Sequence, residues 1–156
     1  MIRAGTESGT QGPRTGKPGK APHAVFTWSV RVYYEDTDLG GVVYHANYLK
    51  FLERARTEWL RYLGIEQDEL RERLGIQFVV VGIKLDYHRA ARFNDQLAVS
   101  VMLASMQRAS LVFAQDVRAV SAGTALVCSA EVRVACVDSL NFKPKPLPRE
   151  IVAELA

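Results

Sequence analysis

Three carboxylates fall within four residues of this 156-residue chain, shortly before a segment with helical spacing. They are Glu35, Asp36 and Asp38, and a stretch containing two glycines separates them from His45, where the helical spacing begins. The first N–H groups of a helix have no partner within the helix and carry partial positive charge. They would stabilise a carbonyl oxygen that becomes an oxyanion, with an upstream carboxylate on the other side of the same carbonyl. This pattern indicates acyl transfer or hydrolysis without a serine or cysteine nucleophile.

The same residues also have purely structural explanations. Asp36 and Asp38 could cap the helix and solvate a turn, and His45 could be a structural or capping histidine. The segment further resembles the start of a calcium loop, with Asp36, Asp38 and Gly41 at its first, third and sixth positions. Its twelfth position is Asn47, however, where a calcium loop needs a bidentate Glu. We therefore expect no calcium site here.

Apolar periodicity predicts the elements that must hold this segment. Apolar residues at every second position in Phe26–Tyr34 predict a strand. Apolar residues with helical spacing in His45–Leu63 predict a long helix. Gly64 follows where a left-handed helix cap is expected, and Glu66–Leu74 is predicted as a second, short helix. Four further strands with short turns are predicted, at Gln77–His88, Gln96–Met106, Ser110–Val120 and Thr124–Asp138.

The order of these elements predicts the fold class. A strand, a long helix and a short helix precede four strands, and short turns between consecutive strands imply an antiparallel meander. Lys143–Pro148 is predicted to be extended, and Arg149–Leu155 to form a short terminal helix. We expect an α+β protein, a single domain in which a curved antiparallel sheet packs on one long amphipathic helix.

The excess positive charge is concentrated at the N-terminus. Residues 1–24 hold four of the 20 basic and one of the 17 acidic residues, so residues 25–156 have 16 of each. We interpret 1–24 as a disordered, Gly/Pro-rich basic leader and 25–156 as the domain, and we expect no nucleic-acid partner. No apolar run approaches the roughly 20 residues of a membrane span, and no secretory signal is recognisable. The sequence therefore predicts a cytoplasmic protein.

Cys128 and Cys136 are the only cysteines. Both fall in one predicted strand, about 27 Å apart at about 3.3 Å per residue, and a disulfide needs Cα atoms within about 7 Å. We predict two buried, reduced thiols.

Three segments around the carboxylates resemble a known family. Val30–Asp38, Gly40–His45 and Glu53–Glu58 closely resemble the Tol-Pal-associated acyl-CoA thioesterases, which belong to the 4-hydroxybenzoyl-CoA thioesterase branch of the hotdog superfamily. The likeness continues through Ser110–Phe113 and Ile151–Glu154 and covers roughly residues 26–155.

The resemblance implies a hotdog fold, in which the sheet wraps the long helix, and dimers that pair into homotetramers. It implies hydrolysis of acyl-CoA thioesters without metal or cofactor. The family's essential carboxylate falls on Asp38, and the helix-start amide that polarises the thioester carbonyl falls on His45, whose side chain also matches a catalytic position. Tyr34 and Thr37 match motif positions and are candidates for substrate binding. Arg108 is a candidate for a CoA phosphate contact.

Several alternatives stay open from the sequence. Asp38 could act as nucleophile or as general base for water. The chain could instead be a non-catalytic module that holds acyl-CoA or acyl carrier protein in envelope lipid synthesis. A hotdog dehydratase is a weaker hypothesis, because the Pro-Gly element that typically follows its histidine is missing. Neither the acyl chain length nor the carrier of the thioester follows from the sequence.

Overall fold

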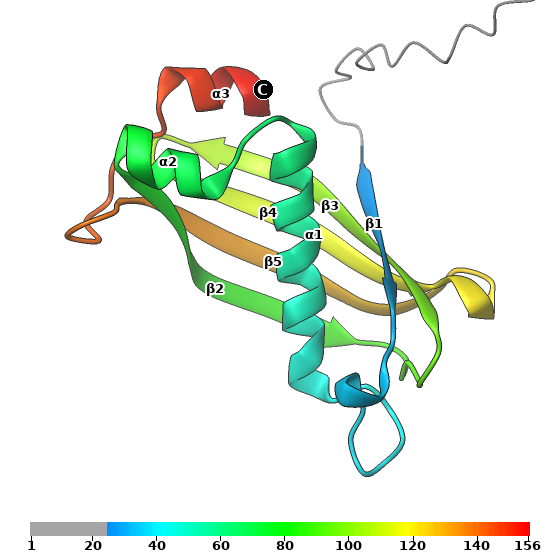
Figure 1. The fold of residues 1–156 in the computed structure, drawn as a ribbon. Coiled ribbons are helices and arrows are strands. Elements are labelled where there is room, and N and C mark those ends of the chain that lie inside the picture. Colours follow the sequence, from blue (N-terminus) through cyan, green and yellow to red (C-terminus); the bar gives the residue numbers. More distant parts are fainter. Residues whose placement is uncertain (1–24) are drawn as a thin grey trace, which may run out of the picture.

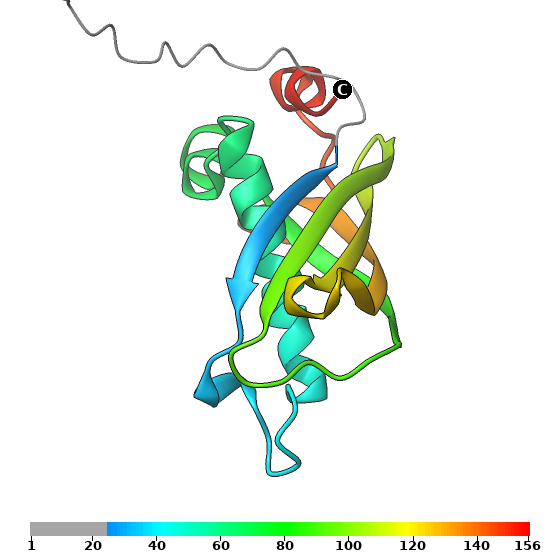
Figure 2. The ribbon, with the colours of Figure 1, turned by 90° about the vertical axis from the view of Figure 1, so that its right-hand side faces the viewer.

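A five-stranded antiparallel sheet curves around one long helix in the computed structural model, which describes residues 25–156 (Figures 1 and 2). This confirms the predicted α+β fold class, whereas the leader predicted over residues 1–24 lies outside the described residues. In chain order the elements are β1 (Phe26–Arg31), α1 (Tyr48–Tyr62), α2 (Gln67–Leu74), β2 (Ile76–Tyr87), β3 (Gln96–Gln107), β4 (Ser110–Ala119), β5 (Ala125–Asp138) and α3 (Arg149–Leu155).

The strand order is β1-β3-β4-β5-β2, which corrects one prediction. β3, β4 and β5 do form a meander, but β2 pairs with β5, so that β4 and β5 lie between β2 and β3. The connection between β2 and β3 therefore runs along one end of the sheet. The N–H groups of His88 and Arg89 both bond to the carbonyl of Val127 in β5, at 2.8 and 3.0 Å. Farther along, Asn94 bonds to the carbonyl of Val32, just past β1, at 3.0 Å.

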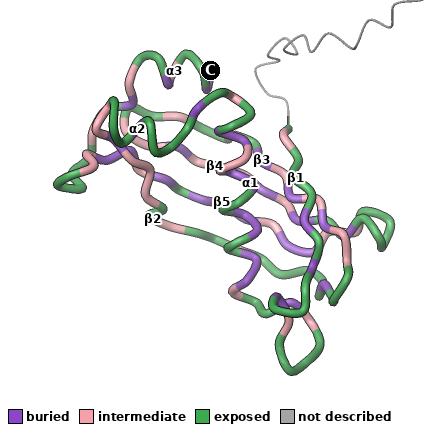
Figure 3. Tube along the Cα trace, viewed as in Figure 1, coloured by how far each residue is buried: buried purple, intermediate pink, exposed green. Residues whose placement is uncertain are grey.

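α1 packs its predicted apolar stripe against the inner face of the sheet (Figure 3). Tyr48, Leu52, Ala55 and Trp59 are all buried, and the Trp59 ring meets Phe113 of β4 edge to face at 5.5 Å. Burying a large apolar side chain contributes about 1.5–3 kcal/mol. This packing fixes the position and direction of α1, and hence the place where its first turn begins.

A polar contact ties the middle of α1 to the sheet. Arg56 is buried, and its Nη1 donates to Oε1 of Gln115 at 2.8 Å. Gln115 Nε2 in turn donates to the carbonyls of Leu52 and Ser100, each at 3.2 Å. Burial lowers the pKa of Arg56 below its ordinary value. The helix is thus held by two hydrogen bonds to Gln115 of β4, which also bonds to β3, as well as by apolar contact.

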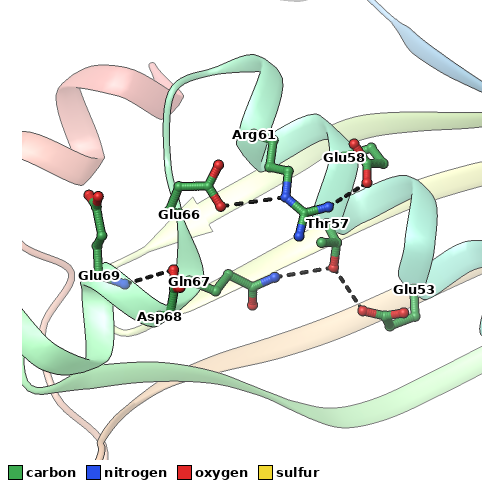
Figure 4. A network of polar contacts seen from close by, with 8 residues as sticks. All are labelled: Glu53, Thr57, Glu58, Arg61, Glu66, Gln67, Asp68 and Glu69. Carbon is green, nitrogen blue, oxygen red and sulfur yellow. Dashed lines mark hydrogen bonds and ion pairs between the residues drawn. The ribbon is translucent and has the colours of Figure 1, made fainter.

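The corner between α1 and α2 is held by exposed polar contacts (Figure 4). Gly64 has a φ of +81°, the left-handed conformation predicted for it. Arg61 pairs with Glu58 at 2.5 Å and with Glu66 at 3.4 Å. Exposed ion pairs of this kind contribute little to stability, so they add only weakly to the packing of the corner.

Both cysteines lie in β5, buried and free, as predicted. Burial, together with the negative charge of Asp116, raises the pKa of Cys128 to about 12. Burial also raises the pKa of Cys136. Because thiolates are the reactive form, both side chains act as small apolar groups of the core.

α3 closes one end of the core through Ile151 and Leu155. None of the helices in residues 25–156 combines the length and the apolar character that crossing a bilayer requires.

Candidate active site

The carboxylate cluster lies in a small hairpin between β1 and α1, at the end of the molecule away from α2 and α3 (Figure 1). Thr37 and Val43 form an isolated antiparallel bridge, and within it the N–H of Asp38 bonds to the carbonyl of Val42 at 2.9 Å. The strand predicted to run to Tyr34 ends at Arg31. Tyr34 instead begins a 3₁₀ turn, Tyr34–Asp36, and its side chain is 83% exposed rather than directed into the core.

Asp38 is exposed, and its own turn holds its carboxylate. The Oδ1 atom of Asp38 accepts the N–H of Gly40 at 2.8 Å. A Cβ atom on Gly40 would lie only 3.1 Å from that oxygen, and Gly41 adopts a φ of +75°. The two glycines therefore permit the turn that fixes the carboxylate. The other oxygen of Asp38 has no partner within residues 25–156, which leaves it available to a substrate or water.

Asp36 has a different environment, although it lies only two residues away. It is buried, and its two carboxylate oxygens accept the N–H of Tyr33 at 2.8 Å and Nδ2 of Asn47 at 2.7 Å. Its carbonyl also accepts the N–H of Tyr44 at 2.9 Å. The structural explanation thus holds for Asp36, whose carboxylate joins the end of β1 to the start of the helix.

The helix predicted from His45 begins with a 3₁₀ turn, His45–Asn47, before α1 starts at Tyr48. The N–H of Asn47 bonds to the carbonyl of Tyr44 at 2.8 Å. The N–H groups of His45 and Ala46, in contrast, have no hydrogen-bond partner among the described residues. The His45 ring is exposed and packs on Tyr44, with centroids 4.6 Å apart. This helix start offers free N–H groups of the kind that stabilise an oxyanion.

Two residues that the sequence analysis did not single out hold this helix start. Asn47, considered there only as a missing calcium ligand, bonds to Asp36. Tyr87, the last residue of β2, donates its hydroxyl to the carbonyl of His45 at 2.7 Å. An asparagine at a helix start is a detectable signal, whereas the Tyr87 contact joins residues 42 positions apart and leaves no local pattern.

The remaining candidate residues divide between the two ends of the sheet. Thr37 lies in the hairpin and donates its hydroxyl to the carbonyl of Tyr34 at 2.8 Å. The exposed ring of Tyr34 meets Phe93 edge to face at 6.2 Å. Arg108 lies in the β3–β4 turn, at the far end of the twelve-residue strand β3, about 36 Å along the strand from the hairpin end. Within one chain, Arg108 is therefore not brought to the hairpin.

A cavity of about 130 Å³ lies between α1 and the sheet. Polar side chains of α1 and α2 line it on one side, and apolar side chains of α1, β2, β4 and β5 line the rest. These residues are Glu53, Arg56, Thr57, Leu60, Gln67, Phe78, Val80, Leu111, Phe113 and Val134.

Among the residues that the structure describes, no group of three or more His, Cys, Asp or Glu side chains is arranged to hold a metal ion. In the hairpin, protein donors occupy both carboxylate oxygens of Asp36, whereas only one oxygen of Asp38 accepts a hydrogen bond.

Comparison with known proteins gives consistent matches over the described domain. The model of the thioesterase-like superfamily matches residues 32–155. The acyl-CoA thioester hydrolase YbgC of Escherichia coli O6:H1 is 50% identical over 130 residues, covering 83% of this chain and 95% of that protein. Acyl-CoA thioesterase YbgC of Haemophilus influenzae is 45% identical, covering 82% and 92%. A probable thioesterase from Bartonella henselae is similar in structure, with a TM-score of 0.74 and 32% identity over 80% of this chain and all of that one.

Proposed function

The chain belongs to the thioesterase-like superfamily, and we propose that it hydrolyses acyl-CoA thioesters to a free acid and CoA. One observation carries the mechanism: the exposed carboxylate of Asp38 and the free N–H of His45 belong to the same hairpin and helix start. The 50% identity to an Escherichia coli acyl-CoA thioester hydrolase supports the choice of substrate class.

The N–H of His45 is the proposed donor to the thioester oxygen. As the carbonyl carbon becomes tetrahedral, its oxygen gains negative charge, which the partial positive charge of the helix start stabilises. This N–H has no partner among residues 25–156 to give up when the substrate arrives, so little reorganisation is needed. The imidazole of His45, exposed beside Tyr44, is proposed to contribute to the hydrolysis as well as the N–H of the same residue.

Asp38 supplies the other half of the proposed reaction. As a general base, its free oxygen takes a proton from water while the water oxygen bonds to the carbonyl carbon; the C–S bond then breaks and the thiolate is protonated. As a nucleophile, the same oxygen attacks the carbon and expels the thiolate, and water then hydrolyses the mixed anhydride. Both routes require the carboxylate to be held in place, and the hydrogen bond from the N–H of Gly40 does this.

Single-turnover hydrolysis in ¹⁸O water separates the two routes. A nucleophilic Asp38 would acquire ¹⁸O in its carboxylate when the anhydride is opened at the enzyme's carbonyl. A general base would leave the label in the released acid alone. Mass spectrometry of the peptide that contains Asp38 gives the answer.

The cavity beside α1 is the proposed site for the acyl chain. Its first α1 residue is Glu53, eight residues beyond His45, and a rise of about 1.5 Å per residue puts it about 12 Å along the helix from the free N–H. The apolar side chains of Phe78, Leu111 and Phe113 would bury an aliphatic or aromatic group there. Tyr34 and Thr37, at the hairpin, are proposed to contact the substrate near its thioester.

The free edge of β2 supports assembly of the chain as a homodimer. β2 is twelve residues long and, within residues 25–156, pairs on one side only, with β5. Val80, Val81 and Ile83 are 44%, 59% and 40% exposed, and a long apolar edge strand tends to pair with another strand. Two-fold antiparallel pairing would bring one end of each β2 beside the opposite end of the other. Arg108 of the partner subunit could then approach CoA phosphates at the hairpin.

A panel of acyl-CoA substrates with thiol detection tests the proposed function. Acyl groups of increasing chain length and one aromatic acyl group should give measurable release of free CoA. The acyl group that is hydrolysed fastest then indicates which group the cavity accommodates best. An acyl-carrier-protein thioester in the same panel tests whether a carrier protein is also a substrate. Tight acyl-CoA binding without thiol release would contradict hydrolysis and favour the binding-module hypothesis. Tetramer formation and a Tol-Pal association remain predictions from the sequence resemblance, and cytoplasmic location remains a prediction from the sequence composition.

A further inference from the structure

Tyr87 connects the edge strand to the start of the helix. Its hydroxyl donates to the carbonyl of His45 at 2.7 Å, and its ring lies 5.8 Å from the ring of Tyr48. Tyr48 is almost fully buried, and its own hydroxyl accepts the N–H of Ala91 at 3.2 Å. The burial of the Tyr48 ring, rather than its hydroxyl, makes it a fixed neighbour for Tyr87, although half of the surface of Tyr87 is exposed. A hydrogen bond from such a donor restrains the backbone that accepts it.

The peptide group that Tyr87 contacts also carries a free donor. The carbonyl of His45 and the N–H of Ala46 belong to one peptide unit, whose atoms are coplanar. A hydrogen bond to the carbonyl thus fixes the direction of the Ala46 N–H. It also draws electron density toward the oxygen, which makes the N–H a stronger donor. The Ala46 N–H has no partner among residues 25–156, like the neighbouring N–H of His45.

We propose that Tyr87 is a positioning residue for the hydrolysis, in which its hydroxyl aligns and polarises the Ala46 N–H as a second donor to the oxyanion. This inference rests on the proposed function and extends it from one backbone donor to two. Two adjacent N–H groups would hold the developing charge from different directions. Such an arrangement acts in the transition state more than in substrate binding.

A purely structural role for Tyr87 makes a different prediction. If the hydrogen bond only fastened β2 to the helix start, its loss would lower the melting temperature and leave turnover unchanged. Tyr48→Phe is the matched control, because it removes a hydroxyl from the adjoining ring without altering the contact to His45. We expect that control to lower the melting temperature and keep kcat within twofold of the wild type.

Tyr87→Phe removes one hydroxyl and keeps the ring. We expect kcat to fall about three- to tenfold, in line with the net value of one hydrogen bond. KM, and the Kd for a non-hydrolysable thioether analogue of the substrate, should stay within twofold. An unchanged kcat in an otherwise active enzyme would overturn the role of Tyr87 and leave the proposed function intact. An equal loss of kcat in Tyr48→Phe would also overturn the role of Tyr87 and leave the proposed function intact. If the wild-type protein releases no thiol from any acyl-CoA, both the role of Tyr87 and the proposed function are overturned.

Discussion

Nδ2 of Asn47 donates to Oδ1 of Asp36 at 2.7 Å, and this buried contact joins the end of β1 to the first turn of the helix. The other oxygen of Asp36 accepts the N–H of Tyr33, so the carboxylate fixes both sides of the hairpin that carries Asp38. Two aspartates only two positions apart in the sequence thus have separate tasks. Asp36 holds the hairpin, and Asp38 is left exposed at its turn.

Asp36→Ala should destabilise the protein. The substitution leaves the Tyr33 N–H and the buried Asn47 amide without their acceptor, a loss that we expect to lower the free energy of unfolding by about 1–3 kcal/mol. Urea unfolding followed by circular dichroism measures this change. Glu35→Ala is the matched control, because Glu35 is an exposed carboxylate in the same turn. Equal stability of the two variants would contradict the structural role of Asp36.

Both thiols should be unreactive in the folded protein. With the Cys128 pKa raised to about 12 and the Cys136 pKa also raised, the thiolate fraction at pH 8 is small, about one part in ten thousand for Cys128. A chromogenic disulfide reagent at pH 8 should detect no thiol in the native protein within minutes and two in denaturant. Rapid labelling of the native protein would show that β5 is less buried than described.

Disrupting the free edge of β2 should reduce the size of the assembly. Val81→Lys combined with Ile83→Lys introduces two charges where the edge is apolar and exposed. We expect the wild type to sediment at no less than twice the mass of the chain and this variant to sediment at a lower mass. Val120→Lys, at a similarly exposed apolar residue after β4, serves as control and should keep the wild-type mass. A monomeric wild type would rule out pairing through β2.

Comparing His45→Pro with His45→Ala separates the contribution of the His45 N–H to turnover from that of the imidazole. Proline is favoured at the first position of a helix, and Tyr44 already has the extended ψ of 130° that a residue before proline needs. Both variants lose the imidazole, but only the proline also loses the N–H. We predict a kcat for His45→Pro about a hundred- to a thousandfold below that of His45→Ala. Equal turnover in the two folded variants would exclude the His45 N–H as the oxyanion donor.

The predictable part of this protein is local, and the rest depends on contacts between distant residues. Helical spacing from Tyr48 to Trp59 predicts the buried stripe of α1, because residues that recur with the helical period share one face. The position of β2 beside β5 is not predictable in the same way. Consecutive strands usually neighbour each other, and here the connection through Arg89 and Asn94 instead takes the chain past the ends of β5 and β4 to β3.

The candidate site shows the same division. The motif resemblance is enough to select Asp38 and His45, but composition alone cannot distinguish Asp38 from Asp36. Their difference comes from Asn47, eleven residues after Asp36, which supplies a buried donor to one carboxylate and not to the other. Tyr87 was not identified from the sequence because its partner lies 42 residues away in the chain.

The most direct test is the rate of thiol release from acyl-CoA by Asp38→Asn, compared with Glu35→Gln. The asparagine keeps the shape of the turn but can act neither as base nor as nucleophile, so we predict a fall in kcat of about two to four powers of ten. Glu35→Gln removes an exposed carboxylate three residues earlier and should stay within about twofold of the wild type. Near wild-type turnover by a folded Asp38→Asn variant would contradict the account.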